Sequence, residues 1–136
     1  MTELISNSTH ETEAFAETLA KTLNQSDMLA LFGGMGAGKT AFVRGLARGL
    51  GFTGETSSPT FAIVHEYRGG RLPLFHFDMY RVAGRDDLES CAFFEYLDAG
   101  GVTVTEWSEN IEAALPENAV RVYFEICGED KRIIRI

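Results

Sequence analysis

Hydrophobic and polar positions along the chain predict an alternation of helices and strands. Residues 9–23 place their apolar side chains at helical spacing, and the continuous apolar run 28–32 is typical of a short buried strand. Residues 40–50 again show one apolar helical face, and Gly51 is suited to end that helix. Gly45 and Gly49 inside it each cost about 1 kcal/mol relative to alanine. Their four-residue spacing predicts close packing of this helix on the sheet.

The second half of the chain predicts more strands, arranged around a hairpin. Residues 61–67 and 72–80 flank Gly69 and Gly70, whose pairing is typical of a hairpin turn and makes the sheet mixed. Residues 86–100 predict one acidic helix, residues 101–107 a strand and residues 109–115 a short helix that Pro116 stops. Two final strands are expected at 119–126 and 131–136. The whole pattern predicts one α/β domain over residues 1–136, with a mixed, mostly parallel sheet between two helical layers.

Composition and charge narrow the possible functions. Hydrophobic residues make up 45% of the chain and charged residues 24%, as in an ordinary globular domain. The polar residues 1–13 lack the apolar core of a signal peptide, and a cytoplasmic location is expected. Cys91 and Cys127 predict neither a disulfide framework nor a metal site. A net charge of −8 argues against autonomous binding to nucleic acid, which depends on a positive surface.

The segment "GGMGAGKT", residues 33–40, carries the clearest chemistry. It matches the pattern G-x-x-x-x-G-K-[ST], lies between a predicted strand and a predicted helix, and therefore predicts a phosphate-binding loop. Backbone N–H groups of such a loop turn toward one anion, and the start of the following helix adds positive charge. Lys39 would reach the β- and γ-phosphates, and the Thr40 hydroxyl would coordinate Mg²⁺. A glycine-rich turn with an incidental lysine is the alternative.

Acidic and hydroxyl side chains elsewhere could complete a cation site. Asp78 and Glu106 each close a predicted strand, and the carboxyl ends of strands are where ligands of α/β sheets collect. Thr60, presented by "SSPTF", could approach Mg²⁺ or the γ-phosphate, or could simply form a turn before a strand. His76 is expected to be half-exposed on a strand. Trp107 could pack under a nucleotide or fill the core, and the core is favoured.

The sequence lacks the motif N-K-x-D, with which common GTPases bind guanine, so ATP is the expected nucleotide. ATP hydrolysis fits a chain of this size best, because few residues remain to bind a phosphoryl acceptor. A P-loop small-molecule kinase and a nucleotide-binding adaptor without turnover remain alternatives.

Taken together, "GGMGAGKT", "SSPTF", "HFDMYR" and "TEW" resemble the TsaE family of bacterial ATPases. The resemblance extends from the N-terminal helix through Trp107. It implies a small ATPase required for threonylcarbamoyl transfer to adenosine beside the anticodon of certain tRNAs. The transfer chemistry would belong to TsaD working with TsaB, so that this protein would meet tRNA only indirectly.

The resemblance also implies roles for individual residues. Thr60 would act as a switch-like hydroxyl, Asp78 and Glu106 would organise metal and water, and Thr9 and His10 would lie on the adenine side. One position departs from the family, which commonly carries an acid where this chain has Gly34. The residues expected to surround the phosphates are Gly33, Gly34, Met35, Gly36, Ala37, Gly38, Lys39, Thr40 and Ala41.

Overall fold

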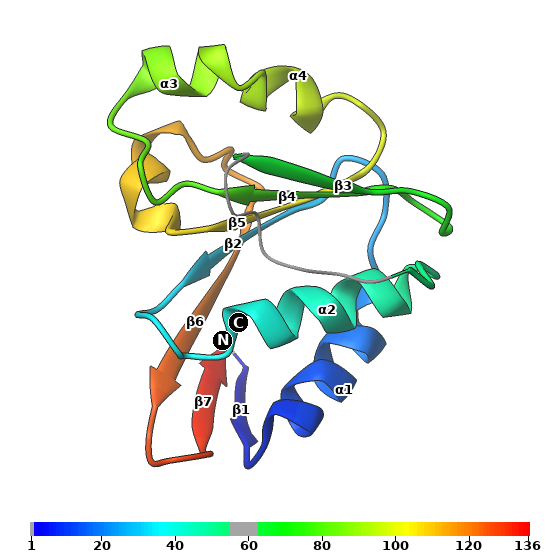
Figure 1. The fold of residues 1–136 in the computed structure, drawn as a ribbon, viewed down its shortest axis with the longest axis vertical. Helices are drawn as coiled ribbons and strands as arrows, with labels where there is room; N and C mark the ends of the chain where they lie inside the picture. The colour runs from blue at the N-terminus through cyan, green and yellow to red at the C-terminus, as the bar shows by residue number, and fades with distance from the viewer. Residues whose placement is uncertain (1, 55–62) are drawn as a thin grey trace.

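The computed structural model describes residues 2–54 and 63–136, and a single sheet of seven strands forms its centre (Figure 1). The strands lie in the order β1-β7-β6-β2-β5-β4-β3. Their bounds are β1 Glu3–Ser6, β2 Met28–Phe32, β3 Val64–Tyr67, β4 Leu74–Asp78, β5 Val102–Glu106, β6 Val120–Ile126 and β7 Arg132–Arg135. Residues 55–62, which include Thr60 and all of "SSPTF", lie outside the described part of the chain.

The sheet is mixed, as the hairpin pattern predicts. β6, β2, β5 and β4 pair in parallel at its centre, while β3 and β7 pair antiparallel with their neighbours. β1 lies antiparallel to β7 at one edge and therefore runs in the direction of the central strands. The parallel centre matters for function because it places the carboxyl ends of β2, β4 and β5 at one edge of the sheet.

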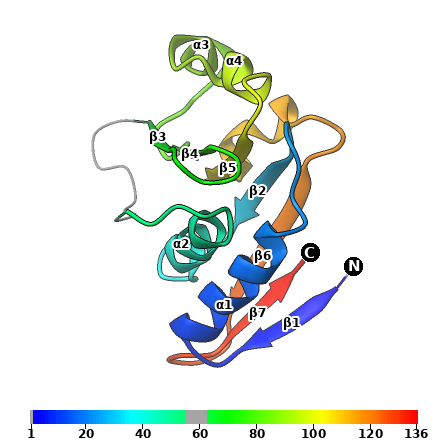
Figure 2. The same cartoon turned by 90° about the vertical axis from the view of Figure 1, so that its right-hand side faces the viewer.

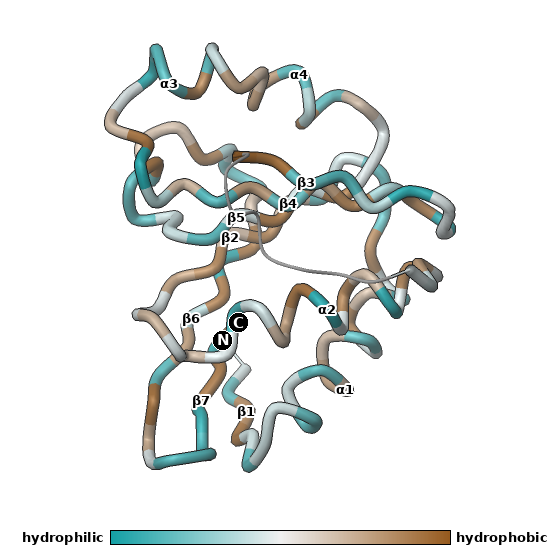
Figure 3. The backbone as a smooth tube through the Cα atoms, in the orientation of Figure 1, coloured by the Kyte–Doolittle hydropathy of each residue, from teal (hydrophilic) through white to brown (hydrophobic). Residues whose placement is uncertain are grey.

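Helices cover both faces, which confirms the expected three layers (Figure 2). α1 (Thr9–Ala20) and α2 (Lys39–Gly49) cover one face, and α3 (Arg85–Ser90), α4 (Phe93–Leu97) and the 3₁₀ helix η1 (Ser108–Ala114) cover the other. Strand residues alternate between two cores: Leu29, Leu31 and Val104 pack with α1 and α2, whereas Met28, Phe75 and Phe77 pack toward α3 and α4. Figure 3 shows the hydrophobic colour concentrated along the central strands.

Three details differ from the sequence-based expectations. The predicted helix over 86–100 is two helices, because Ala92 adopts a left-handed conformation with φ 60° between α3 and α4. β1 was not expected from its polar pattern; as an edge strand it gains backbone hydrogen bonds to β7. Gly45 and Gly49 face α1 rather than the sheet, against the backbone carbonyls of Glu13 and Glu17.

Both cysteines are free thiols. Among the helices of the described residues, none has the length and apolar character that crossing a bilayer requires.

Candidate nucleotide-binding site

The loop between β2 and α2 has a backbone shape that requires glycine. Gly33, Gly36 and Gly38 have φ angles of 150°, 77° and 100°, all in the region that side chains disfavour. Gly33 also packs tightly against the β6 backbone, since a Cβ there would lie 3.0 Å from the Phe124 carbonyl oxygen. No described side chain caps the N-terminus of α2, and the N-terminus of a helix favours anions.

A strand from the end of the chain also holds this loop. Arg132, at the start of β7, donates from a guanidinium nitrogen to the Gly36 carbonyl oxygen at 2.9 Å, and donates to three carbonyls of the β6–β7 turn. Residues 96 positions apart in the sequence are therefore joined at the loop. This contact was not anticipated, since the last strands contribute little to the family motifs.

Lys39 lies under the loop rather than in solvent. Its side chain is buried, and its Nζ donates to the Gly33 carbonyl oxygen at 2.6 Å. The same nitrogen lies 4.7 Å from the centroid of the Trp107 ring, which provides a favourable cation–π contact. The lysine is thus held inside the curve of the loop by one hydrogen bond and one cation–π contact.

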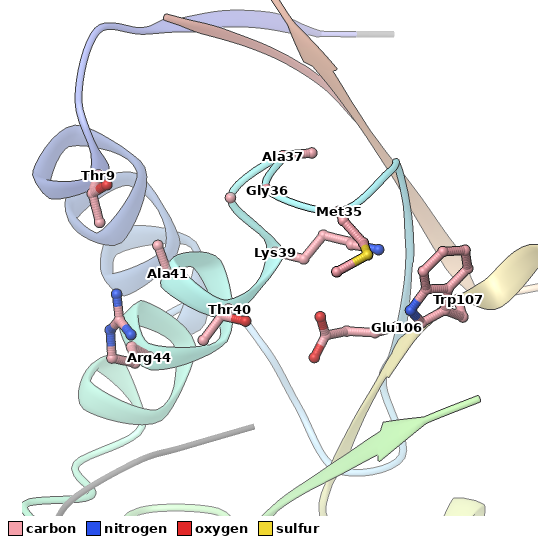
Figure 4. A pocket seen from close by; sticks show the side chains of 11 residues that line it. Thr9, Met35, Gly36, Ala37, Lys39, Thr40, Ala41, Arg44, Glu106 and Trp107 are labelled. Carbon is pink, nitrogen blue, oxygen red and sulfur yellow. The ribbon is translucent and has the colours of Figure 1, made fainter. Parts of the chain in front are cut away.

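The loop forms one wall of a cavity of about 360 Å³ (Figure 4). This volume lies within the usual range for small-ligand sites, about 300–1,000 Å³. Among the described elements, α1, α2 and the end of β5 supply further walls. The lining residues are Thr9, Met35, Gly36, Ala37, Gly38, Lys39, Thr40, Ala41, Arg44, Glu106 and Trp107.

Glu106 joins this cavity from the end of β5, and a buried histidine holds it. Its carboxylate is directed into the cavity on the side of Thr40 (Figure 4). Glu106 is only 7% exposed, and its Oε2 is 2.5 Å from Nε2 of His76, which is 1% exposed. The expectation of a half-exposed His76 was wrong, because β4 lies between β3 and β5 and is covered on both faces. The imidazole ring of His76 stacks on the ring of Tyr67, with the two centroids 6.4 Å apart.

The other predicted residues have different positions. Asp78 lies beside Glu106 in the strand register, but its Oδ1 accepts the Tyr80 backbone N–H at 3.0 Å, and it is not among the described residues lining this cavity. His10 is exposed on α1 and does not line the cavity either, whereas Thr9 does. The prediction for Thr60 falls outside the described residues.

Two residues of the cavity were missed or misjudged from the sequence. The favoured expectation was that Trp107 fills the core. It packs against the core beneath α3 and α4, and it also lines the cavity wall. Arg44 also lines the cavity, and its Nε lies 3.4 Å from Oε1 of Glu13 on α1. The signal for Arg44 was its helical spacing, since it follows Thr40 by four residues and falls on the same face of α2.

The sheet order, the left-handed glycines and the helix that begins at Lys39 define a P-loop α/β domain. Comparison with known proteins agrees with this class and narrows it. Residues 6–134 match the family model described as threonylcarbamoyl adenosine biosynthesis protein TsaE. The chain therefore belongs to the TsaE family, which confirms the resemblance inferred from its motifs.

Individual relatives are similar over most of both chains. The tRNA threonylcarbamoyladenosine biosynthesis protein TsaE of Bacillus subtilis (strain 168) is 42% identical over 124 residues, 91% of this chain and 77% of the relative. The protein of the same name from Treponema pallidum (strain Nichols) is 36% identical over 132 residues, 97% of each. The crystal structure of Bacillus subtilis YdiB superposes with a TM-score of 0.79 at 36% identity, covering 98% of this chain and 82% of that one.

Proposed function

We propose that the protein binds ATP with Mg²⁺ in this cavity and hydrolyses the ATP to support a TsaB–TsaD complex in the threonylcarbamoyl modification of tRNA adenosine. Membership of the TsaE family supports the role in tRNA modification. The observation that carries the ATPase proposal is the meeting of the loop, Lys39 and Glu106 around one cavity.

The loop and α2 suit the triphosphate. Backbone N–H groups around Gly36 and Gly38 and at the start of α2 would donate to phosphate oxygens, and the positive end of the helix favours negative charge. Lys39 would add the ammonium group that neutralises charge at the β- and γ-phosphates. Thr9, which borders the same cavity from α1, would lie on the nucleoside side.

The oxygen donors of the cavity fit Mg²⁺. The Thr40 hydroxyl and the Glu106 carboxylate both line it, and hard oxygen ligands are those that Mg²⁺ prefers. Asp78 would be a second carboxylate one strand away. Among the described residues no three His, Cys, Asp or Glu side chains cluster, so phosphate and water would supply most of the ligands. When bound, the cation would offset the negative charge that develops on the phosphates.

The remaining residues would orient and enclose the reactants. Glu106 is nearly buried and directed into the cavity, so its carboxylate would accept a hydrogen bond from water and hold that water beside the γ-phosphate. Trp107 would exclude solvent from the same side while its ring faces Lys39. Thr60 remains a proposed switch-like hydroxyl on the strength of the family motif alone.

ATP hydrolysis by the purified chain, measured with and without TsaB–TsaD, tests the proposal. Lys39→Ala should lower turnover by at least about a hundredfold, because it removes the cation that meets the transferred phosphoryl group. Lys21→Ala, at an exposed lysine beyond the end of α1, is the matched control and should be unchanged. Both variants should unfold cooperatively near the wild-type temperature.

The outcomes separate the alternative functions. Stimulation by the two proteins supports the proposal, whereas ATP consumption that depends on a small-molecule acceptor would indicate a kinase. Tight ATP binding without turnover, in the presence and absence of partners, would indicate an adaptor. Normal hydrolysis by a folded Lys39→Ala variant would refute the assignment of the loop.

A further inference from the structure

A buried hydrogen bond behind the cavity reaches one of its lining residues. His76 on β4 pairs in register with Val104 on β5, two residues before Glu106, and both His76 and Glu106 point to the α2 face of the sheet. Nε2 of His76 and Oε2 of Glu106 are 2.5 Å apart, with the histidine 1% exposed. His76 is not among the residues that line the cavity. Within the part of the chain that the structure describes, His76 reaches the site only through the Glu106 carboxylate.

The other ring nitrogen shows which way this bond is oriented. Nδ1 of His76 is buried and has no hydrogen-bond partner within the described structure. A buried N–H without an acceptor is costlier than an unused lone pair, because it loses its hydrogen bonds to water without replacement. The proton of the ring therefore belongs on Nε2, from which it is donated to Glu106. The Tyr67 ring, stacked at 23° to the imidazole, holds the plane of the donor.

We propose that His76 is a positioning residue that acts through Glu106. Donation from Nε2 to Oε2 fixes the plane of a carboxylate whose side chain would otherwise sample several rotamers at the cavity wall. The orientation of that carboxylate determines how well it meets the cation of a bound nucleotide, as hydrogen-bonded partners do for the ligands of metal sites in general. This inference rests on the proposed function, since it assumes that Mg²⁺–ATP occupies the cavity.

Two substitutions place an amide at different distances along the side chain. His76→Gln puts an N–H donor near the position of Nε2 and retains the bond to Glu106. His76→Asn is shorter, puts its amide near the position of Nδ1 and does not reach Oε2. The two variants remove the same ring from the stack on Tyr67, so a difference between them reports the hydrogen bond and not the packing.

The first measurement needs no nucleotide. Long-range ¹H–¹⁵N NMR spectra of the free protein assign the tautomers of its three histidines, with the exposed His10 and the half-buried His65 as internal references. We expect His76 in the Nε2–H form, with a signal that changes in Glu106→Gln. An Nδ1–H tautomer would overturn the proposal whether or not any variant folds.

The second measurement is the dissociation constant of ATP, by calorimetry, with Mg²⁺ and with EDTA. His76→Asn should reduce the Mg²⁺-dependent gain in affinity about tenfold or more, the usual effect of losing a partner of a metal ligand, and change the EDTA value less than about twofold. His76→Gln should recover most of the gain. Two results would overturn this inference while leaving the proposed function intact. One is an equal loss of the Mg²⁺-dependent affinity gain in His76→Asn and His76→Gln, and the other is a folded His76→Asn variant that keeps the wild-type gain. A wild type without Mg²⁺-dependent ATP affinity would overturn the proposed function as well.

Discussion

Replacing Gly45 by alanine tests how α1 and α2 are held together. In an isolated helix this change is stabilising, because alanine is favoured over glycine by about 1 kcal/mol. In this structure the new methyl group would point at the backbone carbonyl of Glu13 and lie 2.8 Å from Cβ of Ala16. Neither neighbour is the end of a flexible side chain, so the helices themselves would have to move.

The magnitude follows from comparing these two effects. Extra methyl groups in a packed interior cost about 1–3 kcal/mol, and displacing α1 would also loosen the fully buried Ala16, Ala20 and Leu46. Because the new methyl group meets backbone atoms, the cost lies in the upper part of this range, about 2–3 kcal/mol. Subtracting the propensity gain of about 1 kcal/mol leaves an expected loss of roughly 1–2 kcal/mol in the free energy of unfolding. For a chain of this length such a loss lowers the melting temperature by roughly 3–8 °C.

Urea unfolding followed by circular dichroism, with a thermal melt, measures this change. Gly34→Ala is the control, because a Cβ at Gly34 meets nothing within 4 Å, and its stability should change by less than about 0.5 kcal/mol. Helix propensity would be the dominant effect if Gly45→Ala raised the midpoint of unfolding. That result would refute the close approach of the two helices.

Three further predictions concern the loop, a surface hydrogen bond and the net charge. Gly38→Ala should weaken ATP binding about tenfold or more in calorimetry, because φ is 100° at this position and an L-residue in that region costs about 1–2 kcal/mol. Gly34→Ala, where a Cβ meets nothing within 4 Å, should change the dissociation constant less than twofold. Equal losses of affinity in the two variants would contradict the loop geometry. The Tyr96 hydroxyl, together with Arg68, lowers the pKa of Glu66, and that carboxylate raises the pKa of Tyr96. Their bond should therefore stabilise the fold fully between about pH 4.5 and 10, and its contribution should fade as acid protonates Glu66 or as alkali ionises Tyr96. In urea unfolding the deficit of Tyr96→Phe should shrink from pH 7 to pH 3, and a deficit independent of pH would rule out this linkage. Finally, with a net charge of −8, the isolated chain should show negligible tRNA binding in a filter assay at physiological salt, and tight binding would count against an indirect role.

Local features of the chain were predictable where local chemistry decides them. The strand at Met28–Phe32 and the helix that begins at Lys39 match the apolar pattern, because a buried strand and an amphipathic helix need those periods. The hairpin between β3 and β4 likewise follows from a glycine pair. The break at Ala92 was not predictable in this way, since no glycine or proline marks it.

Contacts between distant residues could not be predicted. The bond from His76 to Glu106 joins positions 30 residues apart and depends on the register of β4 against β5. Because side chains on a strand alternate between faces, a shift of one residue would send His76 into the opposite core. From the sequence alone His76 had only apolar neighbours, which suggested an ordinary strand position.

The sequence by itself predicted a phosphate-binding loop in an α/β setting and identified the chain as a TsaE protein. Those conclusions depend on residue types at fixed short spacings, which constrain the backbone directly. The tertiary structure decided which acid reaches the cavity, which residue orients it, and that Arg132 and Trp107 border the same loop. These depend on strand order and register, which arise from burying both faces of the sheet at once and are not encoded in any single segment.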